Sequence, residues 1–386
     1  MPIFWQPRCI YACLAEILAY RASACPVETG STKARTEALM NILILSASSK
    51  VLLVSAFQKA VQRVGGKVVA ADITAESAAM QTADTAVIVP RSDHPDFPEA
   101  IDAICDTYSI ELIVPTRDGE LSVMAALSAS MLERGISVLV PPSESVAICC
   151  DTRRFVAYCD AAGIPTPKTY ADDETPEAFP VFCRPSNRTM NHPALRVDNK
   201  ASFEAYHTLF GSVAGGVIVQ EFVDAPEYSI DVLMDFDGRP LQAVARRRIA
   251  TRAGESWKTR IEKIPTLTDA ALALSERLGL VGHNTLQAFY SPSLGIRFIE
   301  VNARFGGASN LSIQAGLASP ERIVQMAVGE TAAAAAPRPV GYGQLLLRHA
   351  DDVIVPRDAS EQCMLWSDLN AVTASGWGSS RETGSR

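Results

Sequence analysis

Several common signatures are missing from this 386-residue chain, and each absence removes a class of protein. No apolar run reaches the length of a membrane-spanning helix, so we expect no membrane partner. The formal net charge of −8 argues against nucleic acid or an anionic membrane as the main partner. The nine cysteines form no paired Cys-x-x-Cys set, so we expect no zinc site. Scattered thiols are typical of a reducing compartment, and we predict a cytoplasmic protein.

A dinucleotide-binding turn is also missing. The first strong strand pattern, at 41–46, is followed by Ala47-Ser48-Ser49 rather than by Gly-x-Gly-x-x-Gly, which excludes a Rossmann cofactor site. What is present is a regular alternation of strand and helix patterns, which predicts a doubly wound parallel sheet. Strands are predicted at 41–46, 67–71, 87–90, 112–115 and 137–140, and helices at 51–64, 97–108 and 120–134. Pro141-Pro142 marks the end of this α/β domain.

The second half of the chain has a different, α+β pattern, with hairpins and fewer helices. A single helix is predicted at 145–162 and others at 202–209, 268–278 and 320–328; strands are predicted at 179–184, 196–198, 217–222, 228–235, 241–248 and 343–348. The Asp237-Gly238 turn predicts a hairpin. We therefore divide the chain into a leader at 1–39 (an irregular segment or an appended helix), domains at 40–142 and 143–350, and a C-terminal tail at 351–386.

A hairpin between residues 282 and 302 carries the first candidate site. Two strand patterns, 284–290 and 296–301, flank turn residues at 291–295. The period of two places Glu300 and Asn302 on one face, opposite Gln287 on the neighbouring strand. Such oxygen ligands suit Mg²⁺, which takes its remaining ligands from water and substrate phosphates. A half-buried hairpin with polar residues at its solvent end explains the same pattern, and the stretch alone does not decide.

Further polar residues gather on the predicted strands around this hairpin. Backbone groups of Gln220-Glu221-Phe222-Val223 would pair with an adenine edge, and Glu221 and Glu227 would accept from amino or hydroxyl groups. Arg246-Arg247-Arg248, followed by Lys258 and Arg260, supplies the dense positive charge that a phosphate clamp needs. Arg304 would hold charge that develops on a transferring phosphoryl group. The alternative for each feature is an ordinary solvated strand end.

Three motifs in this region resemble the ATP-grasp superfamily, in particular ligases similar to the carbamoyl-phosphate synthase large chain. They are Gly163-Ile-Pro-Thr-Pro-Lys168, the stretch from Gln220 to Val232, and Phe298-Ile-Glu-Val-Asn-Ala-Arg-Phe-Gly-Gly307. The resemblance covers residues from about 40 to 350. It implies a pre-ATP-grasp α/β domain followed by two α+β subdomains that grip ATP, with a lid subdomain at about 165–225. It also implies ATP-dependent conversion of a small carboxylate to an acyl phosphate, which an amine or another nucleophile attacks.

The resemblance also implies a role for each matching position, with ATP and Mg²⁺ as cofactors. Glu221 and Val223 would meet the adenine and Glu227 the ribose, while Gln287, Glu300 and Asn302 would hold Mg²⁺. Arg304 and Arg248 would face the phosphate and the acyl phosphate. The complete set of predicted site residues adds Arg246 to the catalytic arginines, and Arg184, Gln220, Phe222 and Lys258 to the nucleotide contacts. The partners implied are a small-molecule carboxylate and an amine, and a homodimer is left open.

The chain departs from this family at its phosphate-binding positions. Arg184 stands where the family carries a lysine, and the Ser186–His192 flap contains no glycine. Asp151-Thr152 replaces an Asp-Lys pair. Arginine keeps the positive charge but changes a point-charge contact into a planar fork, whereas loss of the glycines removes close backbone approach to the phosphates.

Two main hypotheses follow, with a third behind them. The metal set and Arg304 favour an ATP-dependent ligase, because metal ligands have no evident use in a pure scaffold. The altered flap favours a nucleotide-binding regulatory module with weakened or lost catalysis. Phosphoryl transfer to a small molecule would use the same residues. Candidate substrate-lining residues are His283, for which a structural role is the stronger interpretation, Trp257 in a charged loop, Ser309 and Asn310.

Overall fold

The structure is a computed structural model that describes residues 39–171, 174–186, 194–212, 215–252, 254–356 and 362–371. The predicted leader, apart from Leu39, lies outside these residues, and so do positions 187–192 of the flap. In the part of the chain that is described, no helix is both long and apolar enough to cross a lipid bilayer.

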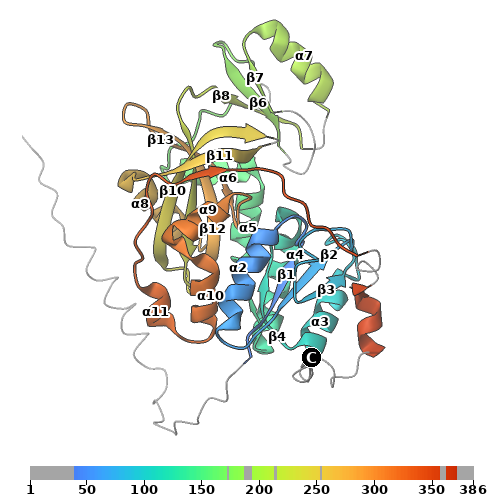
Figure 1. The fold of residues 1–386 in the computed structure, drawn as a ribbon. Coiled ribbons are helices and arrows are strands. Elements are labelled where there is room, and N and C mark those ends of the chain that lie inside the picture. The colour runs from blue at the N-terminus through green and yellow to red at the C-terminus, as the bar shows by residue number, and fades with distance from the viewer. Residues whose placement is uncertain are drawn as a thin grey trace, which may run out of the picture. The chain divides into compact units, whose positions relative to one another are not determined.

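The first domain is a parallel sheet flanked by helices, as predicted (Figure 1). Its strand order is β15-β3-β2-β1-β4-β5, so β1 lies where the chain changes direction across the sheet. Alternate residues of β1 pack on opposite faces: Ile42 and Ile44 join the core under α2, and Leu43 and Leu45 join the core beside α3. The elements are β1 Asn41–Leu45, α2 Val51–Gln62, β2 Val68–Asp72, β3 Thr85–Ile88, α3 Phe97–Tyr108, β4 Ile110–Val114, α4 Asp118–Glu133 and β5 Ser137–Val138.

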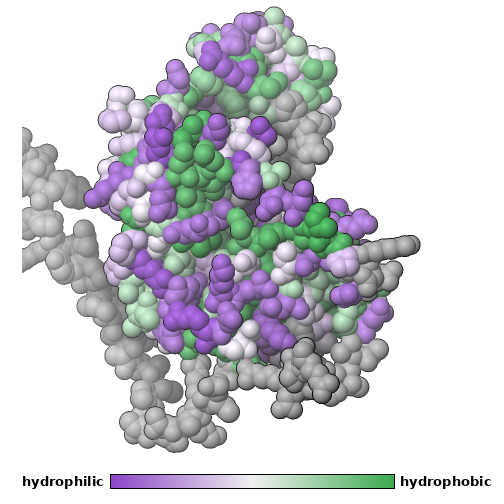
Figure 2. Space-filling model, in the orientation of Figure 1, coloured by the Kyte–Doolittle hydropathy of each residue, from purple (hydrophilic) through white to green (hydrophobic). Residues whose placement is uncertain are grey.

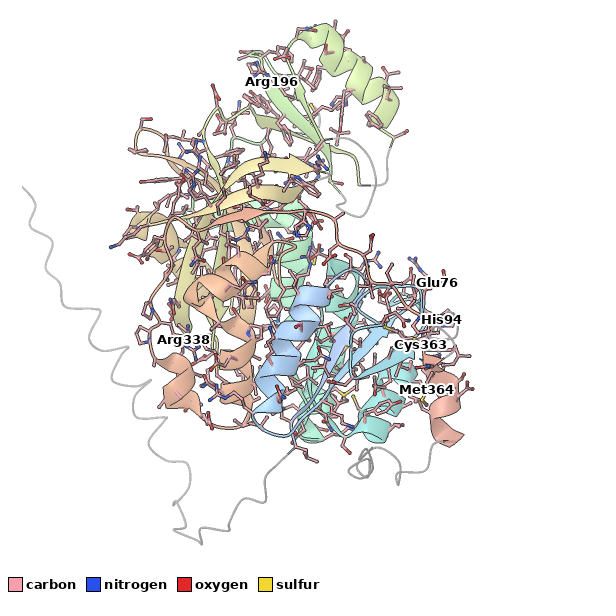
Figure 3. The ribbon with its side chains drawn as sticks, viewed as in Figure 1. Glu76, His94, Arg196, Arg338, Cys363 and Met364 are labelled. Carbon is pink, nitrogen blue, oxygen red and sulfur yellow. The ribbon has the colours of Figure 1, made fainter. Side chains whose placement is uncertain are left out.

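The edge strand of this sheet, β15 (Met364–Leu365), comes from the far end of the chain and was not predicted. It pairs in parallel with β3, and Figure 3 shows Cys363 and Met364 at that edge. The hydroxyl of Tyr108 contacts Met364 Sδ at 3.5 Å. The 3₁₀ helix Trp366–Ala371 then packs on α3. The C-terminal segment therefore covers an edge of the sheet that would otherwise be open.

The second domain contains two antiparallel sheets. The large sheet has the order β13-β12-β9-β10-β11-β14, and the small sheet has the order β7-β6-β8. Their elements are β6 Val181–Pro185, β7 Leu195–Val197, α7 Lys200–Phe210, β8 Val217–Glu221, β9 Glu227–Met234, β10 Pro240–Arg252, β11 Glu255–Glu262, α8 Pro265–Arg277, β12 Gly282–Ser291, β13 Gly295–Asn302 and β14 Leu345–Leu347. Two predictions were wrong here. Trp257 lies on strand β11 rather than in a loop, and Arg246–Arg248 lie in the middle of β10 rather than at its end.

The two faces of the large sheet differ in character because side chains alternate along each strand. On one face, Ile230, Val232 and Leu286 pack with α8 in an apolar core. On the other face, β9 places Glu227, Ser229 and Asp231 in a row. The register brings β10 and β12 residues of the same polar kind beside them: Arg246 and Arg248 on β10, and Thr285 and Gln287 on β12. We call this the polar face.

A β-bulge at Ile299 sets the direction of Glu300. Phe298 pairs with Ala288 and Glu300 with Gln287, so Ile299 has no partner in the register. Without the extra residue, Phe298 and Glu300 would point to the same side of the sheet. The bulge instead lets Phe298 and Val301 both join the apolar core, while Glu300 turns onto the polar face.

The single helix predicted at 145–162 is two helices, α5 (Ser143–Cys150) and α6 (Thr152–Ala161). Asp151 between them is extended, with φ −121° and ψ 119°, and its side chain accepts hydrogen bonds from the backbone N–H groups of Arg153 and Arg154. Aspartate is a strong N-cap residue and a weak helix former, which explains the break. The break presents Thr152 at the start of α6.

The two domains share one core. Helices α2 and α10 (Ser319–Ala327) pack side by side (Figure 1). Phe57 of α2 meets Phe305 edge to face, with ring centroids 5.8 Å apart. The loop 303–307 is therefore anchored between the domains. The short helices in this region are α9 Ser309–Ser312, the π-helix Ile313–Leu317 and α11 Thr331–Ala335.

The segment after β14 exposes apolar side chains. Val353, Ile354 and Val355 are all exposed, Ile354 to 87%. Figure 2 shows hydrophobic surface along this part of the molecule, continuing over the neighbouring strands of the large sheet, where Leu345 and Leu347 are exposed.

Candidate functional site

The predicted metal ligands form one cluster on the polar face. The side-chain amide of Gln287 donates to Glu300 Oε1 at 2.5 Å, and that of Asn302 donates to the same oxygen at 3.1 Å. Glu300 and Gln287 are direct cross-strand partners, and Asn302 pairs with Thr285. The hairpin thus brings one carboxylate and two amides together, as the period-two pattern predicted.

Arg184 connects the small sheet to this cluster. Its Nη1 lies 3.6 Å from Glu300 Oε2, and its Nη2 donates to Thr152 Oγ1 at 3.0 Å. The side chains of Arg184 and Glu300 are 12% and 16% exposed, so water reaches both. Arg184 and Thr152, two positions at which the sequence was expected to depart from the ATP-grasp pattern, are thus in contact.

Arg304 is held by a residue of the first domain. Its Nε and Nη2 donate to the two carboxylate oxygens of Asp118 at 2.8 Å each, and Nη2 also donates to Asn302 Oδ1 at 3.2 Å. Burial alone would lower the pKa of Arg304, but the charge of Asp118 outweighs it and raises that pKa. The paired fork keeps the guanidinium beside the amide of Asn302.

Arg248 and Glu227 form a pair at the open end of the polar face. Arg248 Nε lies 3.0 Å from Glu227 Oε1, and Arg248 Nη2 donates to the carbonyl of Gly254 at 2.7 Å. Burial raises the pKa of Glu227, and the charge of Arg248 offsets this only in part. The resemblance implied that these residues would meet different parts of ATP, whereas the structure places them in contact.

Arg246 belongs to a buried network. Its Nε and Nη2 donate to Asp231 at 2.7 and 3.1 Å, and the two side chains are 1% and 0% exposed. Thr285 Oγ1 donates to Asp231 Oδ1 at 2.6 Å. Ser309 Oγ also donates to this carboxylate and accepts the backbone N–H of Gly306. The network therefore fixes the loop that carries Arg304.

His283 lies against the same network. Its ring stacks on Phe305 with centroids 4.2 Å apart, and Nδ1 lies 2.7 Å from Ser319 Oγ. The side chain is fully buried. Among the candidate lining residues, His283 and Ser309 therefore lie inside the core, while Trp257 packs under the guanidinium of Arg252 at 4.0 Å.

The predicted adenine contacts line the end of β8. Glu221 Oε1 accepts the backbone N–H of Lys168 at 3.0 Å, and buried Gln220 donates to Thr169 Oγ1 at 3.0 Å. Phe222 lies under the guanidinium of Arg196 at 4.5 Å, and Val223 is half-buried. Figure 3 labels Arg196 on the small sheet.

Lys258 is exposed on β11, apart from the other predicted site residues. Its neighbour Thr259 is the cross-strand partner of Arg248. Because adjacent residues of a strand point to opposite faces, Lys258 points away from the polar face. The structure therefore does not bring it to the Glu300 cluster.

The donor set around Glu300 fits Mg²⁺. One carboxylate and two side-chain amides supply hard oxygen ligands once the amides turn their oxygens inward. In the described residues, no group of three or more His, Cys, Asp or Glu side chains has a metal-binding arrangement. Because the cluster supplies a single carboxylate, water and phosphate oxygens would provide the remaining ligands of the ion.

Two residues of the site, Asp118 and Asp231, were not predicted, and neither was the contact of Thr152 with Arg184. Asp118 contacts Arg304 across a large separation in sequence, so no local pattern reveals it. Asp231 carried a usable signal, because a charged residue in the apolar run Tyr228–Met234 predicts a buried ion pair.

Comparison with known families matches two parts of the chain. Residues 42–139 match the family described as "PylC-like, N-terminal domain". Residues 215–344 match "ATP-grasp in the biosynthetic pathway with Ter operon". The predicted resemblance to the ATP-grasp superfamily is confirmed, with residues 215–344 as the part that matches an ATP-grasp family. No curated protein matches the sequence in a direct comparison.

Solved structures share the fold at low identity. The biotin carboxylase domain dimer of 2-oxoglutarate carboxylase from Hydrogenobacter thermophilus, in complex with MgADP, ADP and bicarbonate, has a TM-score of 0.60 and 16% identity over 80% of this chain and 72% of that chain. L-amino acid ligase from Bacillus licheniformis has a TM-score of 0.60 and 16% identity, covering 78% of each chain. N5-carboxyaminoimidazole ribonucleotide synthetase from Thermotoga maritima has a TM-score of 0.55 and 17% identity over 80% of this chain and 79% of that chain.

Proposed function

We propose that this protein is a cytoplasmic ATP- and Mg²⁺-dependent ligase that joins a small carboxylate to an amine. The observation that carries the proposal is the Glu300 cluster. One carboxylate, two amides and the guanidinium of Arg184 meet on the polar face, and Arg304 is bonded to the same Asn302. Several solved structures with this fold are of enzymes named as ligases or synthetases, or are bound to ADP.

The proposed reaction has two steps. An oxygen of the substrate carboxylate attacks the γ-phosphorus of ATP, the bond to the β-phosphate oxygen breaks, and ADP leaves. The nitrogen of the amine then attacks the acyl carbon. The bond between that carbon and the phosphate oxygen breaks, phosphate leaves, and the nitrogen loses a proton. Both steps build negative charge on oxygen, so preorganised cations are the main contribution that a protein can make.

The arginines of the site would supply these cations. Arg184 would stabilise the phosphates through two parallel hydrogen bonds from its planar fork. Arg304, fixed by Asp118, and Arg248, fixed by Glu227 and Gly254, would face the transferring phosphoryl group. Glu300, Gln287 and Asn302 would hold Mg²⁺. That ion, when bound, neutralises phosphate charge.

The direct test is release of ADP from Mg²⁺-ATP across a panel of small carboxylates, with hydroxylamine as a general nucleophile. Capture of an acyl hydroxamate would report the acyl phosphate. We expect ADP release that requires both Mg²⁺ and a carboxylate, and that is lost in Arg304→Gln. Binding of Mg²⁺-ATP without turnover for any carboxylate would contradict the ligase proposal.

A nucleotide-binding regulatory module is the second candidate, and two observations favour it. The cluster contains a single carboxylate, and in the described residues Arg184, Arg248 and Arg304 are each already paired with a protein carboxylate. Tight binding of MgADP together with no hydroxamate from any carboxylate would select this candidate.

A further inference from the structure

A second polar cluster lies at the carboxyl edge of the parallel sheet, where β1 ends. Strand β1 is followed along the chain by β2 on one side and lies beside β4 on the other, which makes its end the topological switch point of the sheet. Ligands of open parallel sheets bind at such points. Ser46 and Ser48, in the turn after β1, have φ values of 47° and 46°. Non-glycine residues rarely adopt this conformation, and it concentrates at functional sites.

Lys50 follows this turn, and its charge has no counter-ion in contact. The half-buried side chain donates from Nζ to the carbonyl of Ser46 at 2.7 Å. In the described part of the chain, no carboxylate oxygen lies within 4 Å of this ammonium group. Burial lowers the pKa of Lys50. The ammonium group has three N–H donors and uses one on Ser46, so the others can bind a ligand at the switch point.

The carboxylates nearest to Lys50 are each bonded elsewhere. Glu120 accepts from the hydroxyl of Ser46 and from the backbone N–H of Thr116, both at 2.5 Å. Asp72 accepts from the backbone N–H groups of Ser48 and Ile73 at 2.6 and 2.7 Å. Glu255 pairs with Arg348. The fold thus holds these anions close to Lys50 but satisfies them with other donors.

Hydrogen bonds connect Lys50, through Ser46 and Glu120, to the helix whose Asp118 holds Arg304. The charges of Glu120, Arg304, Asp72 and Glu255 all act on its ammonium group. Arg304 is bonded to Asp118, the first residue of α4, and Glu120 is the third residue of the same helix. Arg304 also contacts Asn302 of the Glu300 cluster. A substrate whose reacting carboxylate lies beside Arg304 would therefore extend toward Lys50.

We propose that Lys50 binds a second carboxylate of the substrate, so that the enzyme activates dicarboxylates in preference to monocarboxylates. This inference rests on the proposed function for the identity of the reacting group, but the binding of a dicarboxylate does not depend on turnover. The surrounding carboxylates favour a singly charged carboxylate over a phosphate dianion, because each added negative charge is repelled by Asp72 and Glu255.

The test compares ligands of equal length that differ in one charge. Titration calorimetry without nucleotide would measure binding of glutarate, pentanoate and 4-phosphonobutyrate to the full chain. We expect glutarate to bind at least about tenfold more tightly than pentanoate, a difference of about 1.4 kcal/mol. Lys50→Met should remove this preference and leave pentanoate binding unchanged, and Lys50→Arg should keep most of it. Lys59→Met changes an exposed lysine of α2, the helix that begins directly after Lys50; it is the matched control and should retain the preference.

Three outcomes would overturn the inference. They are equal binding of glutarate and pentanoate to the wild type, an unchanged preference in Lys50→Met, and tighter binding of 4-phosphonobutyrate than of glutarate. Circular dichroism of each variant excludes misfolding as the cause of a loss, and Lys50→Arg provides a second variant if Lys50→Met does not fold. A lysine-dependent glutarate preference in a protein that shows no ATP turnover would retain this site and refute only the ligase proposal.

Discussion

The two ends of the polar face carry the same kinds of residues in opposite situations. At the deep end, Asp231 and Arg246 are essentially dry and are closed in by Thr285 and Ser309. At the open end, Glu227 pairs with Arg248 and Glu300 with Arg184, and water reaches at least one partner of each pair. The polar face thus carries a sealed arginine–carboxylate pair and two accessible ones, and Arg184 of the small sheet completes one of the accessible pairs.

The difference separates structural charge from functional charge. A sealed pair cannot exchange its partner for a ligand, because each ion would first have to remain unpaired in a medium of low polarity. An accessible pair can exchange its protein partner for a phosphate or a metal ion at a small cost. Arg246 was predicted to be catalytic, and we now propose that it acts by fixing the loop that carries Arg304.

The largest effect is expected from breaking the sealed pair. Arg246→Met leaves the Asp231 carboxylate buried without its main partner, which should lower the free energy of unfolding by about 3–5 kcal/mol. Chemical denaturation would measure it. The double variant Arg246→Met with Asp231→Leu should recover much of the loss, because no buried charge remains. Equal losses in the single and double variants would show that packing, rather than charge, dominates.

The sealed pair also predicts an acid-dependent stability. Burial alone would raise the pKa of Asp231, but the charges of Arg246 and His283 outweigh it and hold that pKa well below its usual range. The pair therefore stabilises the fold above the unfolded-state pKa of about 3.9, and this contribution is lost as the pH falls through the folded pKa. Unfolding midpoints of the wild type and Asp231→Asn, measured from pH 7 downward, should converge in acid. A constant difference would contradict this.

The next effect concerns the accessible pair between Arg184 and Glu300. Arg184→Ala should weaken binding of a non-hydrolysable ATP analogue by about 2–4 kcal/mol, the range for a lost charge-paired contact. The same change removes a cation from Glu300, so Mn²⁺ alone, followed by electron paramagnetic resonance, should bind more tightly than it does to the wild type. The affinities of Arg184→Lys for both ligands should lie between those of the wild type and those of Arg184→Ala. Weaker binding of both ligands would mean that the variant has simply disordered the site.

The smallest effect is expected at Glu227. Burial raises the pKa of Glu227, so the ionised form costs folding free energy at neutral pH, and this cost disappears as the pH falls through the folded pKa. The stability of the wild type relative to Glu227→Gln should therefore improve as the pH is lowered from 7, which is the opposite sign to the trend at Asp231. If stability changed with pH in the same direction at Glu227 and Asp231, the proposed distinction between the open and deep ends of the polar face would be lost.

Most of the fold was predictable because its signals are local. A few consecutive residues are enough to predict a buried strand such as Asn41–Leu45. The same is true of the turns at Asp237-Gly238 and 291–295. Strand β15 has only two residues, which is too short for a recognisable sequence pattern. It is a strand because it pairs with β3. The break at Asp151 was missed because the apolar spacing continues across it, and only the capping bonds show where the helix restarts.

In the candidate site, the residues on the hairpin were predictable from local sequence, and the partners of the arginines were not. Glu300, Asn302 and Gln287 meet as the strand period requires, although the bulge at Ile299 that makes this possible has no clear sequence signal. The partners of the arginines depend on contacts between distant segments. Asp118 and Arg304 are 186 residues apart, and nothing local pairs them.

Titration calorimetry with Mg²⁺ and a non-hydrolysable ATP analogue tests the central claim that the open end of the polar face binds metal-bound nucleotide. The comparison is between the wild type, Glu300→Gln, and Arg338→Gln as a control at a distant ion pair with Glu321. We predict that the wild type and Arg338→Gln bind equally, and that Glu300→Gln loses at least about tenfold in affinity, or 1.4 kcal/mol, with its unfolding midpoint unchanged. Equal affinity in all three proteins would contradict the account.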